Sequence, residues 1–235
     1  VVARASLVIA VSDFIRSRLL AAGFPPAKVV THRNGIDISY FDGAAGRREP
    51  IVLFVGRFVE KKGCEFLLRA LGLLSRRGVR AKGVLIGEGV LGPSLRQLAA
   101  EVGADVSFTG FLPLDDVKQW LGRAAVVAVP SVTAADGNSE GLPTVILEAQ
   151  SMGTPVVATR HAGNAEGVVE GESALLVDER DVDGLASALR FFLESPRLAA
   201  DFGAAGRRFV KSHFSIETQV AGLEQLYMGV ASSPR

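Results

Sequence analysis

The chain has 235 residues, of which 48% are hydrophobic and 22% charged, and its formal net charge is +1 at neutral pH. A charge so close to zero gives no general reason to expect nucleic-acid or membrane binding. No apolar run approaches the ~20 residues that a membrane-spanning helix needs. The single cysteine, Cys64, excludes an internal disulfide framework, fits a reducing compartment and is expected to be a small apolar group on a helix.

Short apolar segments typical of buried strands alternate with helical patterns along most of the chain. The predicted strands cover residues 7–11, 29–32, 51–56, 84–87, 106–109, 126–130, 155–159 and 174–177. The predicted helices include 63–77, 95–102, 182–194, 198–213 and 216–228. Since uniformly apolar strands that alternate with helices form parallel sheets covered on both faces, the sequence predicts an α/β fold, a doubly wound, Rossmann-like parallel sheet.

A composition break divides the chain. Residues 39–50 are rich in Gly, Ala, Arg and Asp and have no periodicity, which predicts a linker. It separates a small βαβ segment, residues 1–38, from a main domain over residues 51–213. Residues 214–235 are predicted to form a C-terminal helix.

Basic residues follow the first strand of the main domain. Arg57, Lys61 and Lys62 come directly after it, where open α/β sheets bind ligands. Arginine offers a planar fork for phosphate oxygens and lysine a mobile point charge. Because the two lysines are adjacent, we expect only one, Lys62, to face the cleft. A solvated charged loop is an equally weighted alternative.

Residues 87–92 match the dinucleotide-binding pattern G-x-G-x-x-G. We reject that interpretation because the next strand ends in Thr109 and Gly110, with no acid to hold a ribose. A complete strand and helix also precede the pattern, which normally opens its unit. Pro93 and the glycines are instead expected to form a tight turn that can approach a ligand.

Two acids bracket a short, nearly uncharged helix. Glu140 precedes Pro143, which is expected at the first helical position, and Glu148 lies on the second turn. The free amides and the positive dipole end of such a helix attract anions. The small polar loop 131–139 before it is a plausible sugar pocket. The pattern fits a ligand with phosphate in the middle and hydroxyl groups at both ends, such as a nucleotide-sugar.

The loop 160–166 contains a histidine. His161 could serve as an acid or base, but a lone loop histidine is more often a hydrogen-bonding or exposed residue. No pair of His, Cys or Asp residues has the spacing of metal ligands, so no metal site is expected.

Taken together, these segments resemble the retaining GT-B glycosyltransferases of family 4, over essentially the whole chain. Four motifs in the family's order carry the resemblance: Asn34-Gly-Ile-Asp37, Val55-Gly-Arg57…Lys62-Gly63, Glu140-Gly-Leu-Pro…Glu148-Ala, and Met152-Gly-Thr-Pro-Val-Val-Ala. The run 130–141, with Thr159-Arg-His-Ala-Gly, is similar to the branch that makes colanic acid and related bacterial exopolysaccharides.

The resemblance implies catalytic roles for three residues. Arg57 and Lys62 hold the donor diphosphate and, with amides at the helix start, offset the charge on the leaving group. Glu140 binds hydroxyls of the donor sugar. Family members transfer a sugar with retention of configuration, generally without an essential metal, so catalysis depends mostly on positioning and electrostatic stabilisation.

The resemblance also implies the rest of the donor site. Glu148 binds the ribose hydroxyls, and Phe111 and Leu112 lie beside the base. The other expected donor-binding residues are Asn138, Gly141, Leu142, Pro143 and Thr144. No cofactor is expected; the donor is expected to be a UDP-sugar, with a GDP-sugar as the close alternative.

Two departures from the family pattern matter. The G-G-x-P-E loop appears as residues 162–166 without its proline, which predicts a less rigid loop. The chain also starts on Val1 without Met and matches only the donor-binding half of a GT-B enzyme, with residues 1–38 as the end of the acceptor domain. We therefore expect a piece of a longer protein that binds donor and transfers little or no sugar by itself.

The functional prediction is a hexosyltransferase of bacterial surface-polysaccharide synthesis with a lipid-linked or oligosaccharide acceptor. The expected location is cytoplasmic, with peripheral contact to the inner face of the membrane through the N-terminal half. One alternative is another GT-B enzyme such as a nucleotide-sugar 2-epimerase. The other is a catalytically silent nucleotide-sugar-binding module. Retention of Arg57, Lys62, Glu140 and Glu148 favours the transferase.

Overall fold

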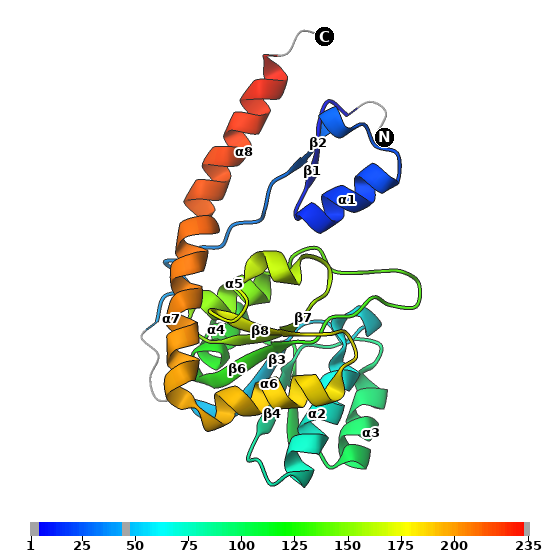
Figure 1. Cartoon of the computed structure of the whole chain (residues 1–235), viewed down its shortest axis with the longest axis vertical. Coiled ribbons are helices and arrows are strands. Elements are labelled where there is room, and N and C mark those ends of the chain that lie inside the picture. The colour runs from blue at the N-terminus through cyan, green and yellow to red at the C-terminus, as the bar shows by residue number, and fades with distance from the viewer. Residues whose placement is uncertain (1–4, 44–47, 233–235) are drawn as a thin grey trace.

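The computed structural model describes residues 5–43 and 48–232 and has the predicted α/β architecture (Figure 1). The strands are β1 Val8–Ala10, β2 Val29–Thr31, β3 Glu49–Val55, β4 Lys82–Ile86, β5 Val106–Gly110, β6 Ala124–Val129, β7 Val156–Thr159 and β8 Ala174–Val177. The α-helices are α1 Asp13–Ala21, α2 Cys64–Arg76, α3 Gly92–Val102, α4 Leu114–Arg123, α5 Thr144–Ser151, α6 Val182–Glu194, α7 Pro196–His213 and α8 Ile216–Ala231. Three short 3₁₀ segments are η2 Pro26–Lys28, η3 Glu60–Lys62 and η4 Ala162–Gly167.

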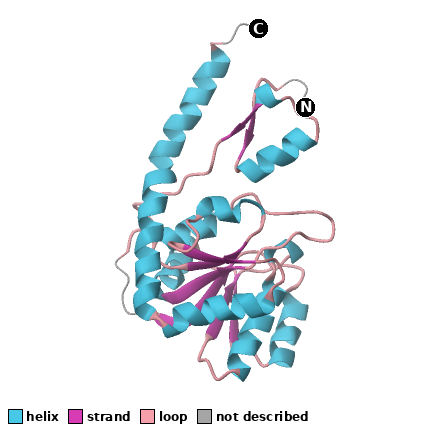
Figure 2. Cartoon of the chain, in the orientation of Figure 1, coloured by secondary structure: helices cyan, strands magenta, loops and turns pink. Residues whose placement is uncertain are grey.

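The main sheet is parallel and has the strand order β5-β4-β3-β6-β7-β8. Figure 2 shows the helices packed around it. Apolar side chains of α2, α3 and α6 form one buried cluster with the sheet, and those of α4, α5 and α7 form the other. Because the chain crosses from one side of β3 to the other between β5 and β6, the sheet has a topological switch point between β3 and β6. Ligands of doubly wound sheets bind at the carboxyl ends of the strands beside such a point.

The first segment forms a parallel βαβ unit of β1, α1 and β2. β1 pairs with β2, and Ser12 caps α1 by accepting a hydrogen bond from the Ile15 amide. Glu166, in η4 of the main domain, accepts hydrogen bonds from the amides of Asp13 and Phe14 at 2.9 and 3.0 Å. A carboxylate at a helix N-terminus offsets the positive end of the helix dipole. The N-terminal unit is thereby fastened to the main domain.

The terminal helix α8 lies beside the segment that leaves the N-terminal unit. Ile36 donates to the carbonyl of Phe214 and accepts from the amide of Ile216, each at 2.9 Å. A side chain at Gly35 would put its Cβ 2.8 Å from the Ile216 Cα, so glycine permits this close approach. Figure 1 shows α8 continuing beyond the main sheet toward β1 and β2.

Part of the segment 39–50, the expected linker, is anchored to the main domain. Phe41 is buried in the core, and β3 begins at Glu49 rather than at residue 51. Arg48 donates hydrogen bonds to backbone carbonyls that end α4 and follow α5, among them Ala124 and Gly153 at 2.9 and 2.7 Å. Burial lowers the pKa of Arg48 to about 10. An averaged composition cannot reveal single anchoring side chains of this kind; residues 44–47 of the segment lie outside the described residues.

Cys64 occupies the expected position. It is the first residue of α2 and is buried in the apolar cluster beneath the sheet. Burial raises the pKa of its thiol to about 12, so the group is neutral at physiological pH and packs as an apolar residue.

Candidate functional site

A cavity of about 690 Å³ opens at the carboxyl edge of β3 and β4, beside the N-terminus of α5. Its position is the one predicted for a ligand of a doubly wound sheet. The lining residues are Val55, Gly56, Arg57, Lys62, Ile86, Gly87, Glu88, Phe111, Leu112, Leu114, Val117, Pro143, Thr144, Val145 and Glu148. The structure therefore brings together seven of the predicted donor-binding residues: Arg57, Lys62, Phe111, Leu112, Pro143, Thr144 and Glu148.

One part of the cavity is suited to an anion. Arg57 is exposed, and among the described residues no ion pair or side-chain hydrogen bond engages its guanidinium group. Lys62 ends η3 on the same side. The Ile146 amide donates to the Pro143 carbonyl, while no protein acceptor among the described residues takes the amides of the two residues before it. Two cations and free helix-start amides form an anion site.

The start of α5 differs slightly from the prediction. Pro143 is the residue before the helix, with φ −64° and ψ 121°, and Thr144 is the first helical residue. An extended ψ at Pro143 lets the chain enter the helix from the loop that carries Glu140. The ring still lines the cavity, so the shift by one residue leaves the predicted amides in place.

Glu148 lines the cavity, where partial burial disfavours the charged form of its carboxyl group. Burial raises the pKa of its carboxyl group, and a hydrogen bond with Thr144 and the charge of Lys62 offset part of that rise. It lies on the second turn of α5, as predicted, on the helix that supplies the anion-binding amides. A half-buried carboxylate with spare acceptor capacity suits hydroxyl donors of a ligand.

Glu140 is more buried than Glu148 and pairs with both adjacent lysines. Its side chain is 10% exposed, with Oε1 3.4 Å from Lys61 Nζ and Oε2 3.3 Å from Lys62 Nζ. Of the two lysines, Lys62 lines the cavity and Lys61 does not, in agreement with the prediction, although both ammonium groups approach the Glu140 carboxylate. Oε1 is buried and has no hydrogen-bond donor among the described residues. Buried polar atoms rarely lack such a partner.

Gly141 and Leu142 do not line the cavity. A Cβ at Gly163 would lie 2.0 Å from the Gly141 carbonyl oxygen, and one at Gly141 would lie 2.9 Å from Val11 Cγ2. These glycines let the N-terminal unit and two loops of the main domain meet. Leu142 is buried in the core beneath α5. Both residues therefore contribute to packing and not to the walls of the cavity.

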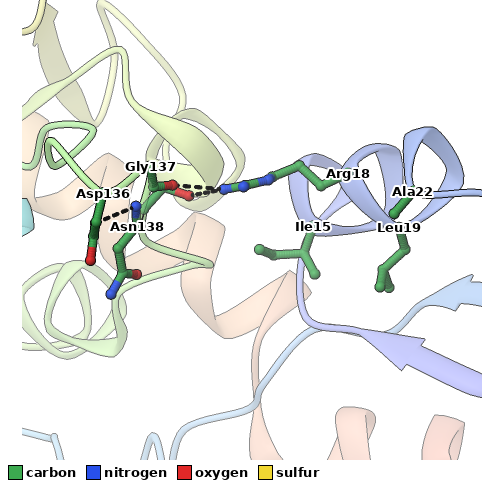
Figure 3. A pocket seen from close by; sticks show the side chains of 8 residues that line it. Ile15, Arg18, Leu19, Ala22, Asp136, Gly137 and Asn138 are labelled. Carbon is green, nitrogen blue, oxygen red and sulfur yellow. Dashed lines mark hydrogen bonds between the residues drawn. The ribbon is translucent and has the colours of Figure 1, made fainter.

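Asn138 lies elsewhere. It lines a second cavity of about 540 Å³ between α1 and the loop 136–139 (Figure 3). Arg18 of α1 reaches that loop and donates to the Gly137 carbonyl and the Ser139 hydroxyl at 3.2 and 2.8 Å. The expectation that Asn138 shares a site with Arg57 is wrong, because a tight turn ending at Gly137, with φ +78°, carries Asn138 toward α1.

The glycine pattern over 87–92 serves close packing. A Cβ at Gly87 would lie 2.1 Å from the Gly56 carbonyl oxygen, and one at Gly89 2.4 Å from that of Phe58. A tight turn is present just before Pro93, where the Gly92 amide donates to the Gly89 carbonyl at 2.9 Å. Pro93 itself lies in the first turn of α3, where proline is well tolerated. Glu88, between the glycines, lines the cavity and was missed; its place just after β4 was the available signal.

His161 is buried and hydrogen-bonded at both ring nitrogens. It is 2% exposed; its Nε2 accepts from the Glu140 amide at 3.1 Å, and its Nδ1 lies 2.6 Å from Glu179 Oε1. The histidine is thus the hydrogen-bonding residue among the alternatives considered. Glu179 was not singled out from the sequence, because nothing local marks it as a partner of His161.

The loop that lacks the family's proline is tied down by side chains. Asn164 is fully buried and donates to the Thr159 carbonyl at 3.1 Å. Glu166 caps α1 and forms an ion pair with Arg33 at 2.7 Å. These contacts hold the loop in place although it lacks the proline.

Two features are absent from residues 5–43 and 48–232. No group of three or more His, Cys, Asp or Glu side chains there is arranged to hold a metal ion. None of the helices in that part of the chain has the length and apolar character needed to cross a bilayer.

Comparison with known proteins identifies relatives of the main domain and of the whole described chain. Residues 49–195 match the family model of glycosyl transferases group 1. The chain is 34% identical over 239 residues to the GDP-mannose-dependent alpha-(1-6)-phosphatidylinositol monomannoside mannosyltransferase of Mycolicibacterium smegmatis, covering 96% of this chain and 63% of that protein. It is 35% identical over 203 residues to the putative colanic acid biosynthesis glycosyltransferase WcaL of Escherichia coli, covering 83% and 50%.

Solved structures share the fold. Sucrose-phosphate synthase from Thermosynechococcus elongatus superposes with a TM-score of 0.85 at 28% identity, covering 98% of this chain and 60% of that one. Anabaena Alr3699/HepE in complex with UDP gives a TM-score of 0.84 at 24% identity, covering 96% and 64%. The chain therefore spans between 50% and 64% of the length of these four proteins.

Proposed function

The chain belongs to the group 1 glycosyltransferases, and on that premise we propose that it forms the donor-binding half of a retaining hexosyltransferase that uses a nucleoside-diphosphate sugar. The observation that carries the proposal is the cavity in which Arg57, Lys62 and the amides of α5 lie together, flanked by Glu148. Two cations and a helix N-terminus match a diphosphate, and a carboxylate on each side of them matches hydroxyl groups.

The proposed chemistry is electrostatic. Arg57, Lys62 and the α5 amides bind the diphosphate and offset the negative charge that grows on it as the glycosidic bond breaks. Glu148 accepts hydrogen bonds from the ribose, and Phe111 and Leu112 lie beside the base. Glu140, held between two lysines, accepts hydrogen bonds from the sugar. No step requires a group of this chain to bond covalently to the substrate.

The proposal also includes the base of the donor nucleotide and the class of acceptor. We favour UDP as the base, while the relative from M. smegmatis is named as GDP-mannose-dependent. The WcaL relative supports an acceptor in surface-polysaccharide synthesis, a lipid-linked or oligosaccharide sugar. With a lipid-linked acceptor, the reaction takes place at the cytoplasmic face of a membrane. The domain division at residues 39–50 is part of the same proposal.

Calorimetric titration of the chain with UDP, GDP, NAD and pyrophosphate tests the proposal. Arg57→Ala should weaken binding of UDP or GDP and of pyrophosphate by roughly 1.5–3 kcal/mol, the range for hydrogen bonds to charged groups. Arg190→Ala is the matched control, because Arg190 is an exposed residue that pairs with Glu194 on α6. Glu148→Ala should weaken both nucleotides and leave pyrophosphate unchanged.

Other outcomes would redirect the assignment. Binding of NAD alone would support the dinucleotide pattern over residues 87–92 and overturn the proposal. Unchanged affinity in Arg57→Ala would remove Arg57 from the site. Donor consumption without an acceptor would indicate an epimerase, and donor binding without transfer by the full-length protein would indicate a silent binding module.

A further inference from the structure

We propose that His161 and Glu179 form a positioning pair that holds the Glu140 carboxylate where the donor sugar binds. The inference rests on the proposed function, in which Glu140 contacts that sugar. His161 is not expected to touch the donor, because it is buried and both of its ring nitrogens are hydrogen-bonded within the protein, one of them to Glu179. Their effect passes through the backbone of the segment that carries Glu140.

The first observation is the geometry of His161. Its ring is buried, and Nε2 accepts the backbone N–H of Glu140 at 3.1 Å. Since that nitrogen accepts, the ring proton of the neutral imidazole is on Nδ1, which donates to Glu179 Oε1 at 2.6 Å. A carboxylate that fixes the tautomer and the rotation of a histidine makes the opposite nitrogen a well-oriented acceptor.

The second observation is that Glu179 also forms hydrogen bonds with Thr133, at the other end of the segment that carries Glu140. Its Oε2 accepts the Thr133 amide at 2.9 Å, and Oε1 lies 3.3 Å from the Thr133 hydroxyl. Arg180, the next residue, donates to the Thr133 carbonyl at 2.6 Å. One carboxylate therefore fastens the chain directly at Thr133 and, through His161, at Glu140.

The segment between these two points needs such support. Residues 130–143 form no helix or strand, yet they deliver a buried carboxylate into contact with Lys61 and Lys62. An irregular segment has many conformations of similar energy, and fixing its backbone is unfavourable in entropy. Hydrogen bonds from a rigid sheet edge select one conformation, and a binding group must be held this closely to contribute fully. Glu179 follows β8, which supplies that rigid edge.

Hydrogen exchange tests the geometry independently of any ligand. The Glu140 amide should be protected in the wild-type chain and lose at least roughly tenfold protection in His161→Leu, since its acceptor is gone. His161→Gln, whose side-chain oxygen can accept the same N–H, should restore most of it. Glu179→Ala, at a more exposed residue, provides the same test if His161→Leu does not fold. His213→Leu is the matched control on α7, and unchanged protection of Glu140 in both test variants would overturn the proposal.

Donor binding tests the consequence. His161→Leu and Glu179→Ala should weaken binding of the nucleotide-sugar roughly threefold to tenfold, as expected for one misplaced hydrogen-bonding group. Affinity for the nucleoside diphosphate alone should change less than about twofold, because Arg57 and Glu148 are untouched. Equal losses for both ligands would indicate a general structural role and overturn the positioning role. A wild-type chain that binds neither ligand would instead overturn the proposed function, while exchange at Glu140 would still decide whether the pair holds this segment.

Discussion

Lys62 Nζ lies 3.3 Å from Oε2 of Glu140, and this ion pair joins the two parts of the candidate donor site. Lys62 also lines the cavity with Arg57, so the same ammonium group serves the carboxylate and the proposed diphosphate position. The Lys62 side chain is 17% exposed, and a charge so shielded from water interacts more strongly than one on the surface. Glu140 and a bound diphosphate should therefore compete for Lys62.

Glu140→Gln should affect the affinities for the two classes of ligand differently. Removing the negative charge releases Lys61 and Lys62 from their ion pairs, so affinity for free UDP or GDP should rise roughly twofold to fivefold, the effect of a modest charge interaction. Affinity for the nucleotide-sugar should rise less or fall, because the amide is a weaker acceptor for sugar hydroxyls. Calorimetric titration with both ligands measures the difference. A parallel loss for both would contradict the competition.

Glu148→Gln should stabilise the unliganded protein at neutral pH. Burial raises the folded-state pKa of Glu148, so its ionised form is less stable in the folded chain than in the unfolded one. Protonated Glu148 contributes to the stability of the wild type. This contribution is complete below the pKa that Glu148 has in the unfolded chain, and it is lost as the pH rises through the pKa that it has in the folded chain. At pH 7 the free energy of unfolding of the variant should exceed that of the wild type by roughly 0.5–2 kcal/mol, as is often found when a functional residue is replaced.

The pH dependence provides the check on that assignment. The stability difference between Glu148→Gln and the wild type should shrink as the pH falls through the acidic range, because the wild-type carboxyl becomes neutral too. Urea unfolding at several pH values measures it. A difference that stays constant with pH would show that the effect does not come from the charge of Glu148.

Gly63→Ala should be strongly destabilising. Gly63 precedes α2 with φ +63°, and a Cβ there would lie 1.8 Å from the Pro130 carbonyl oxygen. Gly78→Ala is the matched control, because Gly78 has φ +74° and open space around its Cα. The control should lose roughly 1–2 kcal/mol for the left-handed backbone alone. Gly63→Ala should lose roughly 1–3 kcal/mol more for the steric overlap, measured by urea unfolding; equal losses would show that the loop can shift away from Pro130.

Arg48→Met should destabilise the main domain. Methionine keeps much of the apolar stem but leaves carbonyls at the ends of α4 and α5 without the donor that Arg48 supplies. Leaving buried acceptors unpaired should lower the free energy of unfolding by at least about 2 kcal/mol. Arg123→Met, which removes an exposed pair with Glu49, should change it by less than about 1 kcal/mol. Thermal and urea unfolding of both variants would test the contrast, and similar losses would contradict it.

The main-chain architecture was predictable because its determinants are local. Each predicted strand overlaps an observed one, and Ala174–Val177 and Val182–Glu194 have the predicted bounds. Continuous apolar runs identify strands buried on both faces, and three- and four-residue spacing identifies the helices between them. The same topology places Arg57 and Lys62 at the ligand-binding edge of the sheet. The family resemblance, rather than topology, assigned Glu148 to the same site.

The sequence by itself thus determined the α/β fold, the edge of the sheet that carries the site and seven of the fifteen residues that line it. Tertiary structure alone decided that both lysines meet Glu140, that Asn138 faces α1, and that Glu179 holds His161. It also decided that Arg48 anchors helix ends more than 70 residues away along the chain. The physical reason is that the spacing of apolar residues close together in the sequence determines which strands and helices are buried. The hydrogen-bond partners of a polar side chain in a loop, in contrast, depend on how distant segments pack.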